Sequence, residues 1–385
     1  MDYYLTEEEQ MIKELAAQIA DEKIVPVRAK FDESGEFPWD IIKVIADADL
    51  FRIFIPEEYE GMGDRAMSLA LVTEELSRAC AGVSVSYAAS ALGAIPIILY
   101  ANDEQKKRFL PRIASGKSLA AFALTESNAG SDAGAIQTTA KLDGNEYVLN
   151  GTKQWITNGG EAEVYTVIAM TDKSRGARGV SAFIVEKGTP GFDFGKKEDK
   201  LGIRASTTRE LIFNDCRIPK ENLLKREGFG FIVAMKTFDK SRPGVAAQAV
   251  GIAEGAFREA LKYSKEREQF GNLISSFQGI QFMLADMGTQ IEAARALTYA
   301  AARMIDKGAK NYKKEAAMAK LFASDVAMKV TVDAVQILGG YGYMKEYPVE
   351  KMMRDAKITQ IYEGTNQIQR LVIASELIRE TVSKK

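Results

Sequence analysis

Hydrophobic residues recur at helical spacing through the first third of the chain. Thr6 and Glu9 form a capping box ahead of the first apolar stripe, and Pro26 predicts the end of that helix or a point close to it. Four further segments show the same spacing: 40–50, 68–80, 84–100 and 103–114. The pattern predicts an N-terminal helical domain over residues 1–118.

The periodicity changes near Leu119. Short runs rich in Val, Ile, Tyr and Phe follow, separated by glycines and polar turns: 138–141, 146–149, 163–170, 180–186 and 210–213. No helical pattern separates these runs. The middle of the chain, residues 119–229, therefore predicts a small antiparallel β-barrel or sandwich and not a parallel nucleotide-binding sheet.

The helical period returns near Gly230 and persists to the end of the chain. Four segments carry it: 231–265, 278–307, 311–338 and 365–379. Their lengths are typical of a four-helix bundle, which we expect over residues 230–385. The predicted fold class is α+β, with an N-terminal helical domain, a middle antiparallel β-barrel domain and a C-terminal four-helix bundle.

One stretch, Ala79–Asn102, carries no charge and is long enough to cross a bilayer. Serines, a glycine and a proline interrupt it, so buried helices beside a pocket are the favoured interpretation, without stable membrane insertion. The N-terminus resembles neither a signal peptide nor a transit peptide. We expect a cytoplasmic, bacterial protein, or a mitochondrial matrix protein only if a transit peptide has been removed.

Composition excludes several kinds of chemistry. The net charge is −2, which argues against a nucleic-acid footprint. The sequence contains no histidine, which removes Ser-His-Asp and Cys-His mechanisms and His-ligated metal sites. Two cysteines cannot build a Cys-rich metal site, and we expect no metal. Acid–base chemistry must depend on Glu, Asp, Lys, Tyr, Cys or a cofactor.

Five segments in order along the chain resemble the acyl-CoA dehydrogenase family. They are FALTESNAGSD at 122–132, WITNG at 155–159, REQFG at 267–271, QILGGYG at 336–342 and IYEGTNQIQ at 361–369. The resemblance covers essentially the whole chain. It implies non-covalent FAD, an acyl-CoA substrate, electron-transfer flavoprotein as electron acceptor, and a homotetramer arranged as a dimer of dimers.

The first two segments are where the resemblance places the flavin ring. Taken alone, 122–132 is a strand that runs into a structural turn, and a lone Trp between strands usually belongs to the core. In the family these segments contact the isoalloxazine, and Ser131 also lies near the CoA arm. The implied cofactor contacts are Phe122, Leu124, Thr125, Ser131, Trp155, Ile156 and Thr157.

The remaining cofactor contacts are implied to come from the bundle. Arg267 alone could be a surface charge or a partner of the helix dipole. In the family the matching arginine binds the FAD pyrophosphate of a neighbouring subunit, a role that suits a permanently charged planar group. The full set is Arg267, Phe270, Gln278, Gln336, Gly339, Gly340, Thr365 and Gln367.

Substrate contacts follow in the same way. Asp239 and Arg242 could form a salt-bridged helix face, but the resemblance places them near CoA and the active site. Small residues such as Ala88 on the uncharged helix leave room for a short-to-medium or compact cyclic acyl group, while Tyr87 limits the depth of the pocket. The implied substrate contacts are Ser131, Asp239, Arg242, Tyr362, Gly364, Tyr87 and Ala88.

Glu363 is the predicted catalytic base. An exposed glutamate just before a helix is common, because the helix dipole favours it. In an apolar, substrate-filled pocket, however, its pKa would rise and it could take the α-proton. In the family its backbone N–H and a flavin hydroxyl polarise the thioester carbonyl. Other family members place the base at the position of Ser241, which cannot serve here, so the short- and medium-chain branch is favoured.

Three alternatives keep the fold and change the function. An acyl-CoA oxidase would pass electrons to oxygen, but such enzymes are typically much longer than 385 residues. An enoyl-CoA reductase would run the reaction backwards and is left open by the sequence. A non-enzymatic flavin-holding relative would lack the base, and the presence of Glu363 argues against it.

Overall fold

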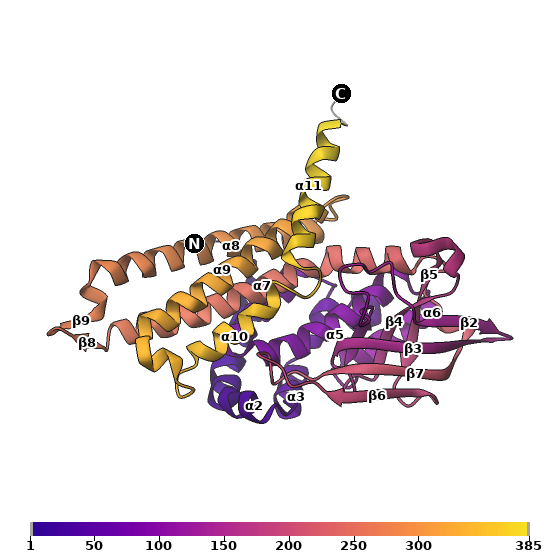
Figure 1. Ribbon diagram of the computed structural model, residues 1–385, viewed down its shortest axis with the longest axis horizontal. Helices are drawn as coiled ribbons and strands as arrows, with labels where there is room; N and C mark the ends of the chain where they lie inside the picture. The colour runs from indigo at the N-terminus through magenta and orange to yellow at the C-terminus, as the bar shows by residue number, and fades with distance from the viewer. Residues whose placement is uncertain (1–2, 383–385) are drawn as a thin grey trace.

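The computed structural model describes residues 3–382; residues 1, 2 and 383–385 of the two expected outer domains lie outside it. Helices occupy the first part of the chain, strands the middle and helices the last part (Figure 1). The strands begin at Ala120 and the sheet ends at Pro219, after which the first bundle helix begins at Gly230. The predicted α–β–α order is confirmed.

Six α-helices form the described N-terminal part: α1 (Glu7–Ile19), α2 (Arg28–Ser34), α3 (Trp39–Asp47), α4 (Ala66–Ala79), α5 (Ala81–Tyr100) and α6 (Asp103–Ala114). The capping box of Thr6 and Glu9 is present, with both reciprocal hydrogen bonds formed. Beyond Ile19 the helix continues as a π-helical turn (Ala20–Ile24) and a 3₁₀ turn containing Pro26, so the predicted stop is confirmed as a change of helix type.

Seven strands form the middle sheet: β1 (Ala120–Ala123), β2 (Thr139–Asp143), β3 (Glu146–Thr157), β4 (Val164–Met170), β5 (Val180–Glu186), β6 (Phe192–Lys197) and β7 (Thr208–Pro219). Their order is β1-β4-β2-β3-β7-β6, with β5 paired to β4. The expectation of a purely antiparallel sheet is wrong at β4, because both β1 and β2 pair with it in parallel. The chain reverses direction between β2 and β3 and again between β3 and β4, so β4 runs in the same direction as β2. The sequence pattern also missed β6.

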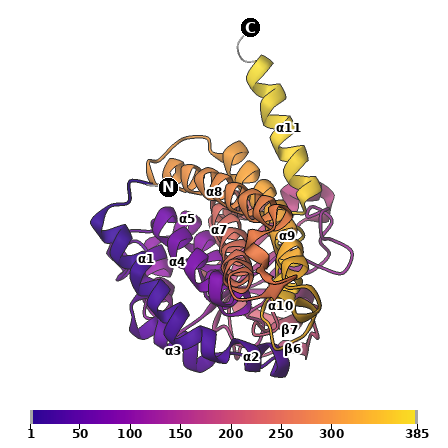
Figure 2. The same ribbon diagram turned by 90° about the vertical axis from the view of Figure 1, so that its left-hand side faces the viewer.

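The C-terminal part contains α7 (Gly230–Ser264), the two-residue strands β8 (Glu268–Gln269) and β9 (Asn272–Leu273), α8 (Gln278–Asp306), α9 (Lys313–Leu338), α10 (Val349–Thr359) and α11 (Asn366–Val382). Helices α7, α8 and α9 lie side by side, and α10 packs on α7 and α9. The expected fourth bundle helix, 365–379, is present as α11: it packs on α9, and its far end projects away from the body of the molecule (Figures 1 and 2). The sequence pattern missed α10, which also packs against the bundle.

Helix α5 joins the regions. Its side chains contribute to one hydrophobic core shared by the N-terminal helices and the sheet, and also to the core of the bundle. The helix is long and apolar enough to cross a membrane by length and composition, yet 83% of its most apolar 18-residue stretch is buried inside the protein. Burial on every side explains why its sequence is apolar all round, as in a core helix.

Candidate active site

Glu363 lies on a short loop between α10 and α11. Its backbone has φ of +51° and that of Gly364 has φ of +89°, so two consecutive residues adopt left-handed conformations. A non-glycine residue costs roughly 1 kcal/mol in this region, so neighbouring structure must hold it. A Cβ at position 364 would lie 2.7 Å from Nε2 of Gln369, which leaves space for glycine only.

Two buried side chains hold the carbonyl groups of this loop. Gln369 donates from Nε2 to the carbonyl oxygens of Gly364 at 2.8 Å and Glu363 at 3.2 Å. Lys320 of α9 donates from Nζ to the Gly364 oxygen at 2.9 Å and to Oδ1 of Asn366 at 2.9 Å. The loop is therefore fixed both to its own following helix and to α9.

Asn366, the first residue of α11, extends the network. Its Nδ2 donates to Oγ of Ser324 at 2.9 Å and to Oδ1 of Asp325 at 2.8 Å, both on α9. Asn366 is 3% exposed, so these bonds form away from solvent. Oε1 of Gln369 is the one atom of these side chains that is buried without a partner among the described residues, and the bonds that do form hold the loop in place.

The Glu363 carboxylate lies among polar groups from three elements. Oε2 accepts a hydrogen bond from the Ser241 hydroxyl of α7. Burial raises the pKa of Glu363 above its usual value, while Ser241, Lys320 and Arg242 act in the opposite direction. Desolvation outweighs the two cations, so this carboxylate accepts a proton more readily than an exposed glutamate.

Two further pairs surround the base. Arg242 donates from NH1 to Oδ1 of Asp239 at 3.0 Å, and both residues are 4% exposed. The Nε atom of Arg242 is buried and has no partner among the described residues. Tyr362 donates from its hydroxyl to Oε1 of Gln248. The structure therefore brings Asp239, Arg242 and Tyr362 to the base loop, as expected from the sequence.

The end of β1 is a second fixed element. The Phe122 ring packs edge-to-face on Phe238 of α7 at 5.6 Å between centroids. The Leu124 carbonyl accepts a hydrogen bond from Nζ of Lys153 at 3.0 Å, and the same Nζ donates to Glu126 at 2.7 Å. Burial lowers the pKa of Lys153 to about 8, although Glu126 opposes the shift. This buried pair holds 122–126 against β3.

Trp155 is displayed by a bulge in β3. The register between β3 and β7 shifts between Lys153 and Ile156, and Trp155 has φ of +55°. A bulge of this kind redirects a side chain out of the strand's alternation. The indole is 57% exposed, while Ile156 is 3% exposed. Ile156 therefore packs in the core, and Trp155 presents an exposed aromatic ring.

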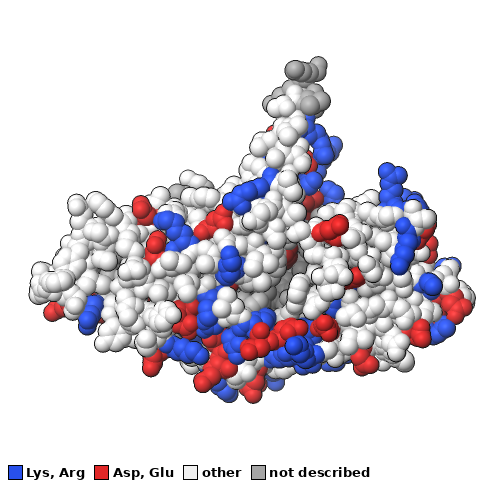
Figure 3. All heavy atoms as spheres, viewed as in Figure 1, with Lys and Arg blue, Asp and Glu red and all other residues white. Residues whose placement is uncertain are grey.

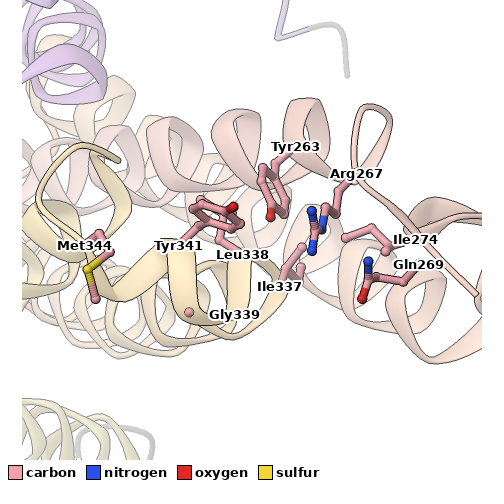
Figure 4. Close-up of a pocket in the computed structure, with 10 residues that line it drawn as sticks. Tyr263, Arg267, Gln269, Ile274, Ile337, Leu338, Gly339, Tyr341 and Met344 are labelled. Carbon is pink, nitrogen blue, oxygen red and sulfur yellow. The ribbon is translucent and has the colours of Figure 1, made fainter.

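The cofactor residues expected on the bundle lie elsewhere. A cleft of about 450 Å³ opens between the end of α7 and the end of α9, and Arg267, Gly339 and Gly340 help to line it (Figure 4). The Arg267 guanidinium lies 5.6 Å from the centroid of the Tyr341 ring. Phe270, in the β8–β9 turn, is 93% exposed. We call this region, which also includes Gln278 and Gln336, the bundle end.

The bundle end and the base loop lie in different parts of the molecule. The bundle end is at the tip furthest from the sheet (Figure 1), and few charged side chains appear there in the view of Figure 3. The surface is hollowed at the foot of α11, beside the sheet domain (Figure 3). Thr365 and Gln367 lie at that foot with Glu363. One chain therefore does not bring all the predicted cofactor contacts together.

Tyr87 requires a correction. The prediction that it limits the depth of an acyl pocket is wrong, because its ring packs edge-to-face on Phe51 and Phe54 within the N-terminal core. Its hydroxyl donates to the Leu50 carbonyl at 2.8 Å, and the side chain is fully buried. The next residue, Ala88, is partly exposed. Successive helix residues point about 100° apart, so only one of the two can face a pocket on that side.

Comparison with known proteins decides the family. Three family models match the chain in order: acyl-CoA dehydrogenase N-terminal domain over residues 6–117, middle domain over 121–216 and C-terminal domain over 228–378. The chain belongs to the acyl-CoA dehydrogenase family. The predicted family, fold and enzyme class are confirmed.

Three similar proteins illustrate the place of this acyl-CoA dehydrogenase family member. Butyryl-CoA dehydrogenase from Megasphaera elsdenii is 48% identical with a TM-score of 0.96, over 98% of this chain and 100% of that one. A chain from the solved structure "Electron transferring flavoprotein of Acidaminococcus fermentans: Towards a mechanism of flavin-based electron bifurcation" is 55% identical with a TM-score of 0.96, over 98% and 100%. Acryloyl-CoA reductase (NADH) from Anaerotignum propionicum is 50% identical over 98% of this chain and 96% of the relative.

Several residues of the base loop network were not predicted from the sequence. Asn366 and Gln369 lie within the family-like segment 361–369, but the sequence predicted no role for either of them. Lys320 gave a clearer signal, because it is a single charge among the closely spaced alanines of 316–323. Ala316 and Ala323 share its helix face at i−4 and i+3, and both are fully buried. A lone charge on an apolar helix face predicts a buried polar contact.

Proposed function

We propose that this protein removes two hydrogens from the α and β carbons of a short-to-medium-chain acyl-CoA, with Glu363 as the base and non-covalent FAD as the electron acceptor. The environment of the Glu363 carboxylate is the observation that supports the proposal. The carboxylate is held in a left-handed loop, bonded to Ser241, and desolvation raises its pKa. A base of this kind matches a weakly acidic C–H group better than an ordinary carboxylate.

In the proposed reaction the Glu363 carboxylate takes the proton from the α carbon. The electron pair of that C–H bond forms the C=C bond as the β hydrogen leaves with its own pair as a hydride. Polarisation of the thioester carbonyl makes the α-proton acidic. We assign this task to the backbone N–H of Glu363, which donates to no acceptor in the part of the chain that the structure describes. The base ends as a neutral carboxylic acid, which burial favours.

FAD, when bound, would supply the acceptor for this hydride. The residues present fit such a group, because a half-exposed indole on a strained bulge is otherwise an unfavourable surface feature. In the proposal Phe122, Leu124, Thr125, Ser131, Trp155, Ile156 and Thr157 hold the flavin end, with Thr365 and Gln367 at the foot of α11. The substrate contacts are Ser131, Asp239, Arg242, Tyr362, Gly364 and Ala88.

The bundle end supports a shared cofactor site. Trp155 lies on β3, whereas the bundle end is at the opposite end of the molecule, beside β8 and β9 (Figure 1), so in the proposal a second copy supplies Arg267, Phe270, Gln278, Gln336, Gly339 and Gly340. Helix α11 projects with exposed apolar side chains, including Leu371 at 64% and Ile378 at 65%, which suit a partner subunit. We propose a homotetramer arranged as a dimer of dimers, located in the cytoplasm.

Two further parts of the proposal follow from the relatives. Electron-transfer flavoprotein is the proposed electron acceptor, since a relative at 55% identity comes from a structure described by that flavoprotein. The division of the chain into 1–118, 119–229 and 230–385 remains our proposal for its domain boundaries. A butyryl-like acyl group is the first substrate to test, given the similarity to butyryl-CoA dehydrogenase.

Anaerobic addition of butyryl-CoA to the FAD-loaded protein tests the proposal. We expect the visible absorbance of the oxidised flavin to bleach in the wild type. Glu363→Gln should bind FAD and the thioester but bleach about a thousandfold more slowly. Glu346→Gln, an exposed glutamate before α10, is the matched control and should behave as wild type. Near-normal bleaching by Glu363→Gln would remove that residue from its role.

The reverse reaction is the second candidate. It is favoured by the 50% identity to an acryloyl-CoA reductase. A raised pKa in Glu363 suits both directions, because the protonated base can return its proton to the α carbon. Reoxidation of reduced enzyme by an enoyl-CoA, measured against bleaching by the saturated thioester, gives the preferred direction. Peroxide formation in air would instead indicate an oxidase.

A further inference from the structure

The environment of Lys320 is unusual for a charged side chain. Lys320 lies on α9 and is fully buried, and a lone ammonium is costly to remove from water unless it is paired. Its two hydrogen bonds go to uncharged oxygens, those of Gly364 and the Asn366 side chain. No carboxylate of the described chain forms a direct ion pair with it. The fold therefore retains a buried amine without an adjacent counter-charge.

The charge that interacts most strongly with Lys320 is the Glu363 carboxylate. Burial lowers the pKa of Lys320 to about 7, Glu363 opposes that shift, and Arg242 adds to it. The two cations near the base are not equivalent. Arg242 is hydrogen-bonded to Asp239, which offsets its charge, whereas Lys320 has no such partner. Lys320 thus acts on Glu363 with its charge less offset than that of Arg242.

The hydrogen bonds of Lys320 also reach the backbone of the base. Glu363 and Gly364 both have positive φ, and the Gly364 carbonyl is held from one side by Gln369 and from the other by Lys320. Removing the Nζ donor would free one side of the Gly364 peptide. Because a left-handed residue is intrinsically disfavoured, the loop would then sample other conformations.

We propose that Lys320 is a positioning residue for the base: it holds the Gly364 carbonyl so that Glu363 keeps its left-handed conformation, and in its protonated form it adds a positive charge near the carboxylate that no ion pair offsets. The inference rests on the proposed function of Glu363. It assigns a role to a helix residue 43 positions before the base in the sequence, outside all five family-like segments. Lys320 touches neither reacting carbon in this scheme and acts through Glu363.

The charged and titratable groups around the base come from every element packed against it. They are Asp239 and Arg242 on α7, Lys320 and Asp325 on α9, and Tyr362 in the loop itself. Only Lys320 combines full burial, a bond to the loop backbone and no carboxylate partner among these described groups. A change confined to Lys320 should therefore report on the base more directly than a change at the other groups.

Lys320→Met tests the proposal, because methionine keeps the volume of the side chain and removes its charge and donors. The measurement is the rate of anaerobic flavin bleaching by butyryl-CoA as a function of pH, at low substrate concentration. Loss of the cation should raise the pKa of Glu363, so the acid limb should move to higher pH by about one unit. At a fixed pH on the acid limb of both proteins, the rate should fall about tenfold for that shift, with FAD content unchanged.

Matched variants make the outcome decisive. Lys329→Met changes an exposed lysine of the same helix, paired with Asp333, and should leave the profile at the wild-type position. Lys320→Gln keeps a hydrogen-bond donor without the charge and should show the same pH shift. If Lys320→Met does not accumulate as folded protein, the profile of Lys320→Gln decides. An unchanged acid limb in the folded variant overturns the electrostatic role.

Hydrogen–deuterium exchange of the peptide covering 360–366 tests the backbone role without turnover. Exchange should be faster in Lys320→Met than in Lys329→Met or wild type, and equal rates would refute the tether. This readout also separates the two proposals. If Glu363→Gln bleaches normally, the proposed base is wrong whatever Lys320 does. If Glu363→Gln is inactive and Lys320→Met behaves as wild type, only the Lys320 inference fails.

Discussion

The base loop and the bundle end differ in how many of their polar and apolar groups find partners within one chain. Around Glu363 the side chains of three helices hydrogen-bond to the loop, and Lys320 and Gln369 are fully buried. At the bundle end Phe270 is 93% exposed, and a Cβ added at Gly339 would meet no described atom within 4 Å. A single chain thus preorganises the proposed proton chemistry, whereas the bundle end presents binding groups that remain open.

The difference indicates two kinds of dependence. A buried hydrogen-bond network loses much stability when one member is removed, because the remaining groups stay buried with fewer partners. An open surface loses little in its own stability and can lose much in binding. Variants at the two regions should therefore separate stability from cofactor retention.

The largest stability effect is expected at Asn366. Asn366→Ala removes hydrogen bonds to Lys320, Ser324 and Asp325 and leaves Lys320 with one partner. We expect a loss of about 3 kcal/mol in the free energy of unfolding, measured by chemical denaturation. Asn272→Ala, at the bundle end, removes an exposed contact to the Phe270 carbonyl and should cost less than about 0.5 kcal/mol. Equal losses would break the comparison.

Arg267→Ala should have the opposite signature. Loss of a charge-assisted contact to a phosphate weakens binding by about 2 kcal/mol, or roughly thirtyfold in the FAD dissociation constant. The unfolding free energy of the apoprotein should hardly change, because the Arg267 guanidinium forms a cation–π contact with Tyr341, and such a contact contributes little at an exposed site. Arg258→Ala removes an exposed arginine of α7 and is the control. Full FAD retention in Arg267→Ala would argue against the shared site.

The pH dependence of the wild type follows from the base. The pKa of Glu363 is raised above 4.5 by burial, so the carboxylate that accepts the α-proton is lost on acidification well before an exposed glutamate would be. The rate at low substrate should therefore rise tenfold per pH unit below that pKa and level off above it. Glu346→Gln should leave the inflection in place. An inflection at or below pH 4.5 would contradict the desolvated base.

The smallest effect is expected from the corrected residue. Tyr87→Phe removes the hydrogen bond to the Leu50 carbonyl and should cost about 1 kcal/mol in stability without altering acyl-chain preference. Ala88→Trp adds a large side chain at a partly exposed position and should reduce activity toward longer acyl chains. A turnover screen across acyl-chain lengths with an artificial electron acceptor measures the chain preference of both variants, and chemical denaturation measures the stability of Tyr87→Phe. A chain-length change in Tyr87→Phe would restore Tyr87 to the pocket.

Local pattern and motif order determined much of this protein. The helical period of 103–114, the strand 180–186 and the capping box of Thr6 each appear as predicted, because their periodicity and end signals are local. The five motifs and the absence of histidine pointed to a flavin-dependent chemistry with a glutamate base. These inferences needed only neighbouring residues and a family pattern.

Tertiary structure decided what depends on residues distant in sequence. The parallel pairing of β1 with β4, the packing of α10 on α7 and α9, and the burial of Tyr87 each follow from which surfaces meet, and periodicity does not specify that. The meeting of Lys320 with Gly364, 44 residues apart, is of the same kind. A charge in an apolar helix signals that a partner exists, but only the packing of α9 on the loop shows that the partner is the backbone beside the base.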